Sequence, residues 1–251
     1  CDVPTPNLGQ LASEGTLFRQ AFCGAPTCSP SRAAMLTGMT AHQSGMLGLV
    51  HRGFHLSDPA RHLACGLRAA GFETALAGVQ HEFRPEELPL AYETAFRPAT
   101  GDGAEADDLS AAAWAAEFLR QRHSRPFFLS CGFIHPHREF PAAGGETRRE
   151  HPVPPPYLPD HPAVREDLAR YGDAAARMDR AAGIVIRAIH DTGHDRDTLV
   201  IFTTDHGIAF PGAKCCLSDA GIGVALIIRP PTGQPRRPET DALVSHLDRS
   251  E

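Results

Sequence analysis

Residues 28–38 read CSPSRAAMLTG and place a sulfur nucleophile, Cys28, four residues before a cation, Arg32. Both lie at the predicted start of a helix. The Ala, Met and Leu residues favour a helix, Ser29 is a candidate N-cap, and Gly38 predicts the helix end. Cys28 is therefore expected at or just before a helix N-terminus, where free N–H groups and the helix dipole favour an anion. Arg32 adds a planar guanidinium suited to a tetrahedral oxyanion. The stretch predicts a nucleophile beside an oxyanion site; the alternative is a buried free cysteine in a turn.

Histidines and an aspartate follow three predicted strands at the point where each strand ends. The combinations are residues 73–78 with His81, residues 126–134 with His135 and His137, and residues 198–204 with Asp205 and His206. Helices are expected at residues 107–123 and 163–192. This alternation predicts an α/β fold with a largely parallel central sheet flanked by helices on both faces. Ligands bind beyond the carboxyl ends of such strands, so these side chains are expected to share one rim with Cys28.

Two further features suit the binding of a metal ion or an anion. Asp205 and His206 offer an oxygen and a nitrogen ligand at adjacent positions, and a hard divalent cation is bound through carboxylates. The alternative is a turn that ends the strand, with Asp205 making a local hydrogen bond. Lys214 is the only lysine of the chain. That favours a specific role for it, although loop lysines are usually just solvated.

Composition limits the remaining possibilities. At 251 residues the chain suits one sizeable α/β domain or two small ones. The net charge of −6 comes without a long charge block, which argues against a nucleic-acid partner, and no apolar run approaches a membrane span. Seven irregularly spaced cysteines argue against a disulfide scaffold, and the spacing of Cys23, Cys28, Cys215 and Cys216 disfavours a zinc site. Residues 139–162 are expected to form a long proline-rich loop, which is usually functional or poorly ordered.

The pattern Cys-x-Pro-Ser-Arg-x-x-x-Leu-Thr-Gly at residues 28–38 resembles the signature of the type I sulfatases at every fixed position. The resemblance implies an alkaline-phosphatase-like fold and hydrolysis of sulfate esters. It also implies that Cys28 is oxidised to formylglycine by a formylglycine-generating enzyme or an anaerobic maturase. Residues 42–49 and 133–138 resemble the sulfamidase-like (heparan N-sulfatase-like) branch, which implies a sulfated carbohydrate substrate carrying an N-sulfate or an O-sulfate.

The same resemblance gives the histidines their roles. It implies that the hydrated formylglycine at position 28 attacks sulfur and that His137 protonates the leaving group. His135 is expected to bind substrate or only to orient His137. His81 resembles the family histidine that assists the formylglycine hydrate.

The resemblance also implies a site for one divalent cation. Asp205 and His206 resemble the family's second metal motif, and together with residue 28 they are expected to hold the ion, with Ca²⁺ as the expected metal. Lys214 resembles the sulfate-binding lysine of the family. Arg32, Lys214 and the cation are expected to stabilise charge on the transferred sulfate.

Two departures from the family pattern keep other functions open. Val79 stands where the family pattern Gly-Lys-x-His has its lysine, and the adjacent aspartates that sulfatases carry on a first strand are absent. Residues 1–251 are therefore expected to be a single sulfatase catalytic domain in fragment form, without that strand and the C-terminal subdomain, and with weakened cation binding. The alternatives are a phosphonate or phosphodiester hydrolase of the same superfamily and a non-catalytic, sugar-binding fragment. The compartment is left open, and the resemblance favours an extracytoplasmic one.

Overall fold

The computed structural model describes residues 3–98, 104–141 and 152–248. The α-helices in this part of the chain are α1 (Pro6–Glu14), α2 (Cys28–Thr37), α3 (Ala41–Ser44), α4 (Leu63–Ala69), α5 (Leu88–Ala91), α6 (Ala104–Arg120), α7 (Pro162–Asp191) and α8 (Asp219–Ile222). The strands are β1 (Thr16–Phe22), β2 (Glu73–Gly78), β3 (Thr94–Phe96), β4 (Phe127–Gly132), β5 (Val200–Thr203), β6 (Gly223–Arg229) and β7 (Glu239–Ser245). Short 3-10 turns occupy Val50–Arg52, Pro59–Arg61, Pro85–Glu87 and His194–Arg196.

The strands of the described chain form two hydrogen-bonded groups. In the order β3-β2-β4, both pairs are parallel. In the order β5-β6-β1-β7, β1 is parallel to β7, whereas β6 is antiparallel to both of its neighbours. Three of these five pairs are parallel, and the predicted α/β class with a largely parallel sheet is confirmed. The prediction of one central sheet differs in that β4 and β5 share no ladder in the described residues.

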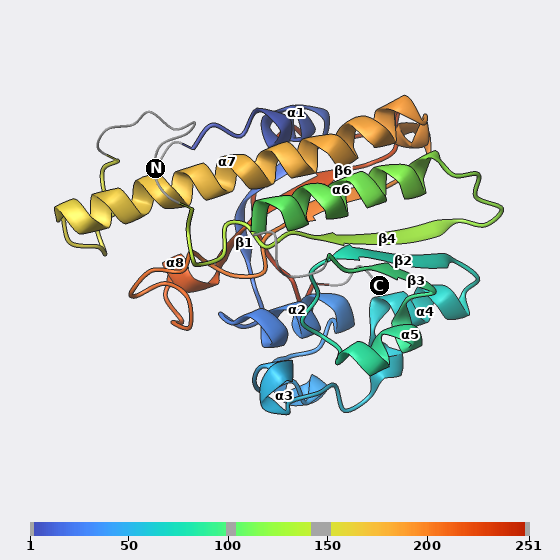
Figure 1. Cartoon of the computed structure of the whole chain (residues 1–251), viewed down its shortest axis with the longest axis horizontal. Helices are drawn as coiled ribbons and strands as arrows, with labels where there is room; N and C mark the ends of the chain where they lie inside the picture. Colours follow the sequence, from blue (N-terminus) through green and yellow to red (C-terminus); the bar gives the residue numbers. More distant parts are fainter. Residues whose placement is uncertain (1–2, 99–103, 142–151, 249–251) are drawn as a thin grey trace.

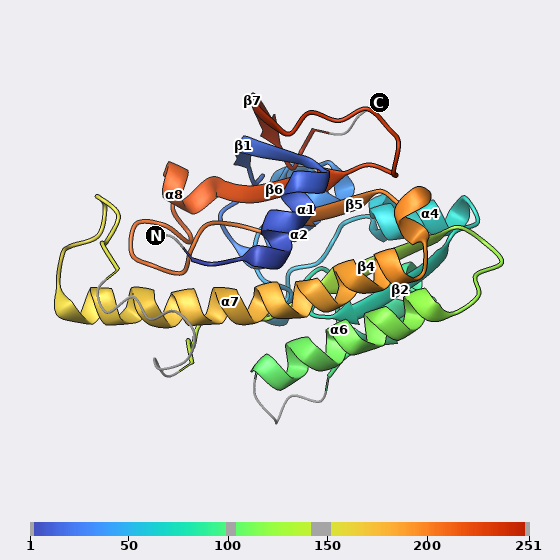
Figure 2. The ribbon, with the colours of Figure 1, turned by 90° about the horizontal axis from the view of Figure 1, so that it is seen from above.

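Helices cover both faces of the strands, as predicted. The helices α6 and α7 run side by side over one face (Figure 1, Figure 2). There Ile189 of α7 belongs to a cluster with Phe127 of β4 and Val200 of β5, so one helical layer covers both groups of strands. On the opposite face, Ala64 of α4 packs in a cluster with Leu76 of β2. Burial of these apolar side chains is the main force that holds the layers together.

A carboxylate on α7 caps helix α1. Thr5 is the N-cap residue of α1 but makes no side-chain capping bond. Asp179 instead accepts hydrogen bonds from the backbone N–H of Asn7 at 3.1 Å and of Leu8 at 2.8 Å, and from the Asn7 amide at 2.7 Å. Because the first N–H groups of a helix lack partners within the helix, this carboxylate both satisfies them and fixes α1 against α7.

Most predicted elements occupy their expected positions, and the main differences lie at the start of α2 and at strands β3 and β7, which the sequence pattern does not indicate. Helix α2 begins at Cys28 with Thr27 as its N-cap. Ser29, the expected cap, lies inside the helix, where its Oγ accepts a hydrogen bond from the N–H of Val50 at 3.2 Å. The residues of β7 are mostly exposed or half-buried, so the sequence gives little hydrophobic signal for this strand. Part of the loop predicted at residues 139–162 lies outside the described residues.

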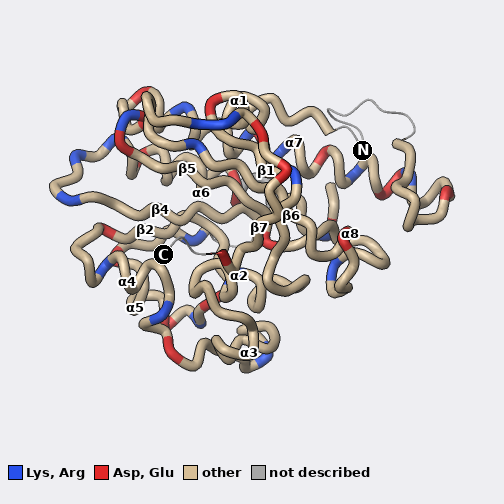
Figure 3. Tube along the Cα trace, turned by 180° about the vertical axis from the view of Figure 1, so that it is seen from behind, with Lys and Arg blue, Asp and Glu red and all other residues tan. Residues whose placement is uncertain are grey.

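The surface of the described chain carries both charges. Acidic and basic residues are interspersed along α7 (Figure 3). Among the described residues, no helix combines the length and apolar character that crossing a membrane requires.

Candidate active site

Cys28 is the first residue of α2 and is 7 % exposed. The preceding Thr27 is extended, with φ −146° and ψ 142°, so the chain turns into the helix at the cysteine itself. The helix ends at Gly38, which adopts the left-handed conformation with φ 65° and donates its N–H to the carbonyl of Ala34 at 2.8 Å. This geometry places Cys28 where unpaired N–H groups and the dipole favour a negative charge, as the sequence predicts.

Three histidines and a lysine converge on the Cys28 thiol. Burial raises its pKa, but side-chain contacts with His137, His206 and His81, together with the charge of Lys214, outweigh burial and lower the pKa to about 3. The Sγ atom lies 3.4 Å from Nε2 of His206. The residue at position 28 is therefore negatively charged at neutral pH and surrounded by donors from three other segments of the chain.

Asp205 and His206 follow β5 and lie beside Cys28. The side chains of the three residues offer ligand atoms that all lie within 4.8 Å of one another. Nδ1 of His206 faces the carbonyl of Gly207 at 2.8 Å, so Nδ1 keeps a proton, and Nε2, which faces Cys28, is the atom that a metal ion would bind after Nε2 loses its own proton. Burial raises the pKa of Asp205, but Arg32 and His206 outweigh burial and lower it, so the carboxylate is ionised. Cys23, Cys215 and Cys216 do not join this group within the described residues.

Arg32 lies between two carboxylates. Its Nε is 3.2 Å from Oδ2 of Asp205, and its Nη1 is 3.8 Å from Oε1 of Glu82. Burial lowers the pKa of Arg32, but these carboxylates outweigh burial and raise it, so the guanidinium stays charged. Ser31, its neighbour on α2, donates a hydrogen bond to the backbone carbonyl of Asp205. Helix α2 and the end of β5 are thus joined by two contacts beside Cys28.

Lys214 and His137 form one side of the site. Nζ of Lys214 lies 3.2 Å from Nε2 of His137. Contact with Cys28 raises the pKa of His137, against the effects of burial and of the Lys214 charge. Nδ1 of His137 faces the carbonyl of Arg138, so Nε2 is the atom available for proton exchange in the site. The structure therefore brings together the predicted proton donor and the predicted sulfate-binding cation.

His135 is buried behind the site. Its Nδ1 lies 2.7 Å from Oδ2 of Asp108 on α6, and the same carboxylate accepts the N–H of His135 at 3.1 Å and of Ile134 at 2.6 Å. Only 3 % of the His135 side chain is exposed. The structure therefore shows His135 buried against Asp108, and the two roles that the sequence leaves open for it stay predictions.

His81 belongs to a turn that follows β2 and is fixed by its neighbours. Its N–H donates to Oε2 of Glu82 at 3.1 Å. Oε1 of Gln80 accepts the N–H groups of Glu82 and Phe83, both at 2.9 Å. Val79, at the position of the family lysine, donates its N–H to Gly132 of β4 at 2.9 Å. The turn thus presents His81 to Cys28 without a lysine beside it.

A pocket of about 730 Å³ opens next to His137 and Lys214. Most of its other lining residues are apolar and come from the segment before α7, from α7 and from the loop after β5; they include Leu158, Pro159, Val164, Phe210 and Pro211. Arg138 and Asp167 add charge to the lining and form an ion pair. The Arg138 guanidinium also lies over the rings of Phe140 and Phe210, at 4.4 and 5.0 Å from their centres. A leaving group bound here would lie next to the predicted proton donor.

The sequence pattern does not indicate two residues that support the site. Glu82 and Asp108 are 2 % exposed, and each holds a predicted residue in place. Glu82 directly follows His81, which is a local signal that could have identified it. Asp108 lies 26 positions from Ile134, whose N–H it accepts, and no local pattern relates the two.

Comparison with known proteins agrees with this geometry. A protein of Bacteroides thetaiotaomicron, described with the metabolism of multiple glycosaminoglycans, has a TM-score of 0.82 at 20 % identity, covering 98 % of this chain and 63 % of that one. A phosphonate monoester hydrolase from Silicibacter pomeroyi has a TM-score of 0.72 at 21 % identity, covering 98 % and 67 %. These likenesses define an alkaline-phosphatase-like α/β fold.

The family model of the sulfatases matches residues 2–249, and the chain belongs to the sulfatase family. Human N-sulphoglucosamine sulphohydrolase is 34 % identical over 276 residues, an alignment that covers 98 % of this chain and 54 % of the human protein. The chain spans about half the length of the curated relatives it matches, with coverage of 54 %, 47 % and 47 % for three of them.

Proposed function

We propose that the protein hydrolyses sulfate esters or N-sulfates on a sulfated carbohydrate, using formylglycine formed from Cys28 by a formylglycine-generating enzyme or an anaerobic maturase. One observation carries the proposal: His137, His206, His81 and Lys214 converge on the first residue of α2. Similarity to the human sulphohydrolase supports a sulfated sugar as the substrate class. We also propose an extracytoplasmic location, which is supported by the family resemblance alone.

The residues around position 28 suit this chemistry. In the unmodified chain, Sγ of Cys28 stands where the oxygen atoms of formylglycine lie after conversion. Hydrated formylglycine supplies the hydroxyl that attacks sulfur. His137 donates a proton to the leaving oxygen or nitrogen through Nε2, and His81 accepts a proton from residue 28 at the end of the cycle. Arg32 and Lys214 bind the sulfate oxygens and offset the charge that develops on them.

A divalent cation fits the donor set in part. Asp205 and His206 would hold the ion together with residue 28, and their ligand atoms lie close enough for one ion. A calcium ion takes six to eight oxygen ligands, roughly, and the described residues offer one carboxylate and the group at position 28 as hard donors. When bound, the ion supplies positive charge next to the sulfate oxygens. The small number of donors makes weak cation binding the expected property of this chain.

Mass spectrometry tests the proposal at the residue on which it depends. The protein is produced with and without a formylglycine-generating enzyme, and the tryptic peptide of residues 20–32 is weighed. Conversion exchanges the sulfhydryl for an aldehyde oxygen and lowers the mass by about 18 Da. The converted protein is then assayed with Ca²⁺ on N-sulfated and O-sulfated glucosamine and on matched phosphate and phosphonate monoesters.

Release of sulfate that depends on conversion and is absent in Cys28→Ala supports the proposal. Preference for the phosphorus esters would instead assign the protein to the hydrolase alternative. Complete conversion without turnover of any ester would contradict an enzymatic role.

A further inference from the structure

Glu82 is a buried carboxylate to which neither the family resemblance nor the proposed chemistry gives a role. Only 1 % of its side chain is exposed. Burial raises its pKa, against the effect of the Arg32 charge. A buried carboxylate is costly unless it is paired and hydrogen-bonded, so its partners indicate why it is there.

The partners of Glu82 are two residues of the site. Oε2 accepts the backbone N–H of His81 at 3.1 Å, and Oε1 lies 3.8 Å from Nη1 of Arg32. Gln80 fixes the same turn from its other end, since its Oε1 accepts two backbone N–H groups and its Nε2 donates to the carbonyl of Phe83 at 2.9 Å. The carboxylate is therefore held at a defined position between His81 and Arg32.

The guanidinium of Arg32 is in turn restrained by two carboxylates. Its Nε donates to Asp205 at 3.2 Å, and its Nη1 lies 3.8 Å from Glu82, within ion-pair distance. An arginine has five N–H donors in a rigid planar arrangement, so a hydrogen bond at Nε together with an ion pair at Nη1 restricts the direction of the remaining donors. A single carboxylate would leave the plane free to turn about one contact.

We propose that Glu82 is a positioning residue that aims the Arg32 guanidinium at the sulfate and holds His81 beside residue 28. The inference rests on the proposed function and deepens it by assigning a support to two of its residues. This role also explains why a negative charge is buried in a site that must attract an anion. The orientation of the Arg32 guanidinium improves sulfate binding by more than the Glu82 carboxylate weakens it through repulsion.

Two roles of Glu82 predict opposite effects on anion binding. If Glu82 only adds negative charge, Glu82→Gln removes repulsion and sulfate binds more tightly. If Glu82 positions Arg32, the same change releases the guanidinium and sulfate binds more weakly. Inorganic sulfate is the probe, and acetylation of Lys214, the only lysine of the chain, is the readout. Protein with Cys28→Ser is used throughout, because it removes the thiolate that would repel sulfate.

The sulfate concentration that halves the Lys214 acetylation rate is measured by peptide mass spectrometry. It is expected to rise by about tenfold in Glu82→Gln, which corresponds to 1.4 kcal/mol. Glu87→Gln is the matched control, because Glu87 lies in the same segment and pairs with Arg84 at 2.7 Å near the surface. This control is expected to leave the concentration unchanged.

A second variant distinguishes an effect on sulfate binding from a loss of folding. Glu82→Asp keeps the charge but shortens the side chain, so positioning predicts an intermediate loss of sulfate affinity, whereas a purely electrostatic role predicts none. Thermal unfolding is recorded for each variant. If sulfate protects Lys214 in the parent protein and binds equally well or more tightly in Glu82→Gln, the positioning role of Glu82 is overturned while the proposed function stands. Absence of sulfate protection in the Cys28→Ser parent would overturn this role, whereas the proposed function is judged separately by conversion of Cys28 and by sulfate release.

Discussion

Nζ of Lys214 lies 3.2 Å from Nε2 of His137, although 77 positions separate the two residues. One follows β5 and the other follows β4, so the carboxyl ends of two strands in different groups meet at this contact. The lysine charge lowers the pKa of His137, while contact with Cys28 is the larger effect and raises it. Contact with Cys28 is thus the largest effect on the acidity of the proposed proton donor, and burial and the Lys214 charge oppose it.

Replacement of Lys214 should remove charge stabilisation from the sulfate. In the converted enzyme, Lys214→Ala is expected to lower kcat/KM by about 10²–10³, the range for loss of one stabilising donor. Lys214→Arg keeps the charge and should recover part of the loss. Steady-state kinetics on the best sulfated substrate measures both variants. Equal rates for Lys214→Ala and the parent would remove Lys214 from the site.

The unmodified Cys28 thiol should be alkylated at pH values well below the ordinary pKa of a cysteine. With a pKa of about 3 it is ionised throughout the neutral range, so alkylation by iodoacetamide is expected to be nearly constant between about pH 5 and pH 8. Burial raises the pKa of Cys65 above its ordinary value, so the alkylation rate of Cys65 should climb over the same range and serves as an internal control. Peptide mass spectrometry after timed labelling measures both thiols.

The same thiol links stability to pH. Its folded pKa of about 3 lies below the unfolded value of 9.0, so the unfolded chain binds the proton more strongly between these values. Its contribution to stability is complete above the unfolded pKa and is lost as the pH falls through the folded pKa. In Cys28→Ser, the free energy of unfolding measured with urea should therefore rise less steeply with pH between about 3 and 9.0. An unchanged slope would count against a lowered thiol pKa.

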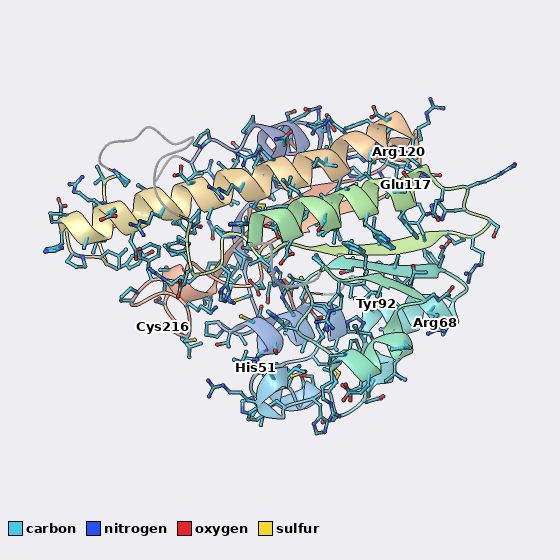
Figure 4. All side chains as sticks on the ribbon, in the orientation of Figure 1. His51, Arg68, Tyr92, Glu117, Arg120 and Cys216 are labelled. Atoms are coloured by element: carbon cyan, nitrogen blue, oxygen red, sulfur yellow. The ribbon has the colours of Figure 1, made fainter. Side chains whose placement is uncertain are left out.

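Asp108 should matter for both stability and proton donation. Asp108→Asn weakens a buried pair with His135 and is expected to cost about 3 kcal/mol. Because the carboxylate also fixes the strand end that carries His137, kcat should fall more than KM rises. Glu117→Gln is a control on the same helix, where Glu117 and Arg120 are exposed and 3.7 Å apart (Figure 4). Urea unfolding and steady-state kinetics are the measurements; wild-type kinetics in Asp108→Asn would contradict the orienting role.

Asp179 should be one of the most sensitive positions outside the site. Asp179→Ala leaves the first N–H groups of α1 without their acceptor and is expected to cost about 2–3 kcal/mol. In a chain of this size that lowers Tm by roughly 4–12 °C. Glu166→Ala, which removes an exposed partner of Arg170 on the same helix, should change Tm little. Calorimetry distinguishes the two variants.

Calcium should stabilise the folded protein through Asp205. Converted protein at a Ca²⁺ concentration about 100 times the Kd is expected to gain about 2.7 kcal/mol, since only the folded state holds the ion. Asp205→Asn should abolish the gain, and Asp219→Asn, which alters an exposed acidic residue, should keep it. An equal rise of Tm in Asp205→Asn would place the bound ion elsewhere.

The residues of the site with short-range signals could be predicted from the sequence. Cys28 and Arg32 share one helical turn, and His81, His137 and Asp205 each follow an apolar run, so chain order alone places them at strand ends. The α/β class follows from the same alternation, because apolar strands and amphipathic helices can bury their faces in few ways. The sequence predicts Ser29 as the cap of α2, whereas the folded chain uses Thr27, because both are ordinary cap residues and packing decides between them.

The tertiary structure decided which side chains support these residues and what charge they carry. The pairing of Asp108 with His135, of Asp179 with α1 and of Glu82 with Arg32 depends on burial and on segments far apart in the chain. The low pKa of Cys28 has the same origin, because it needs donors that follow three separate strands. A sequence fixes the chemical groups and their local geometry, whereas desolvation and long-range partners, which set the energy of a buried charge, exist only once the chain is folded.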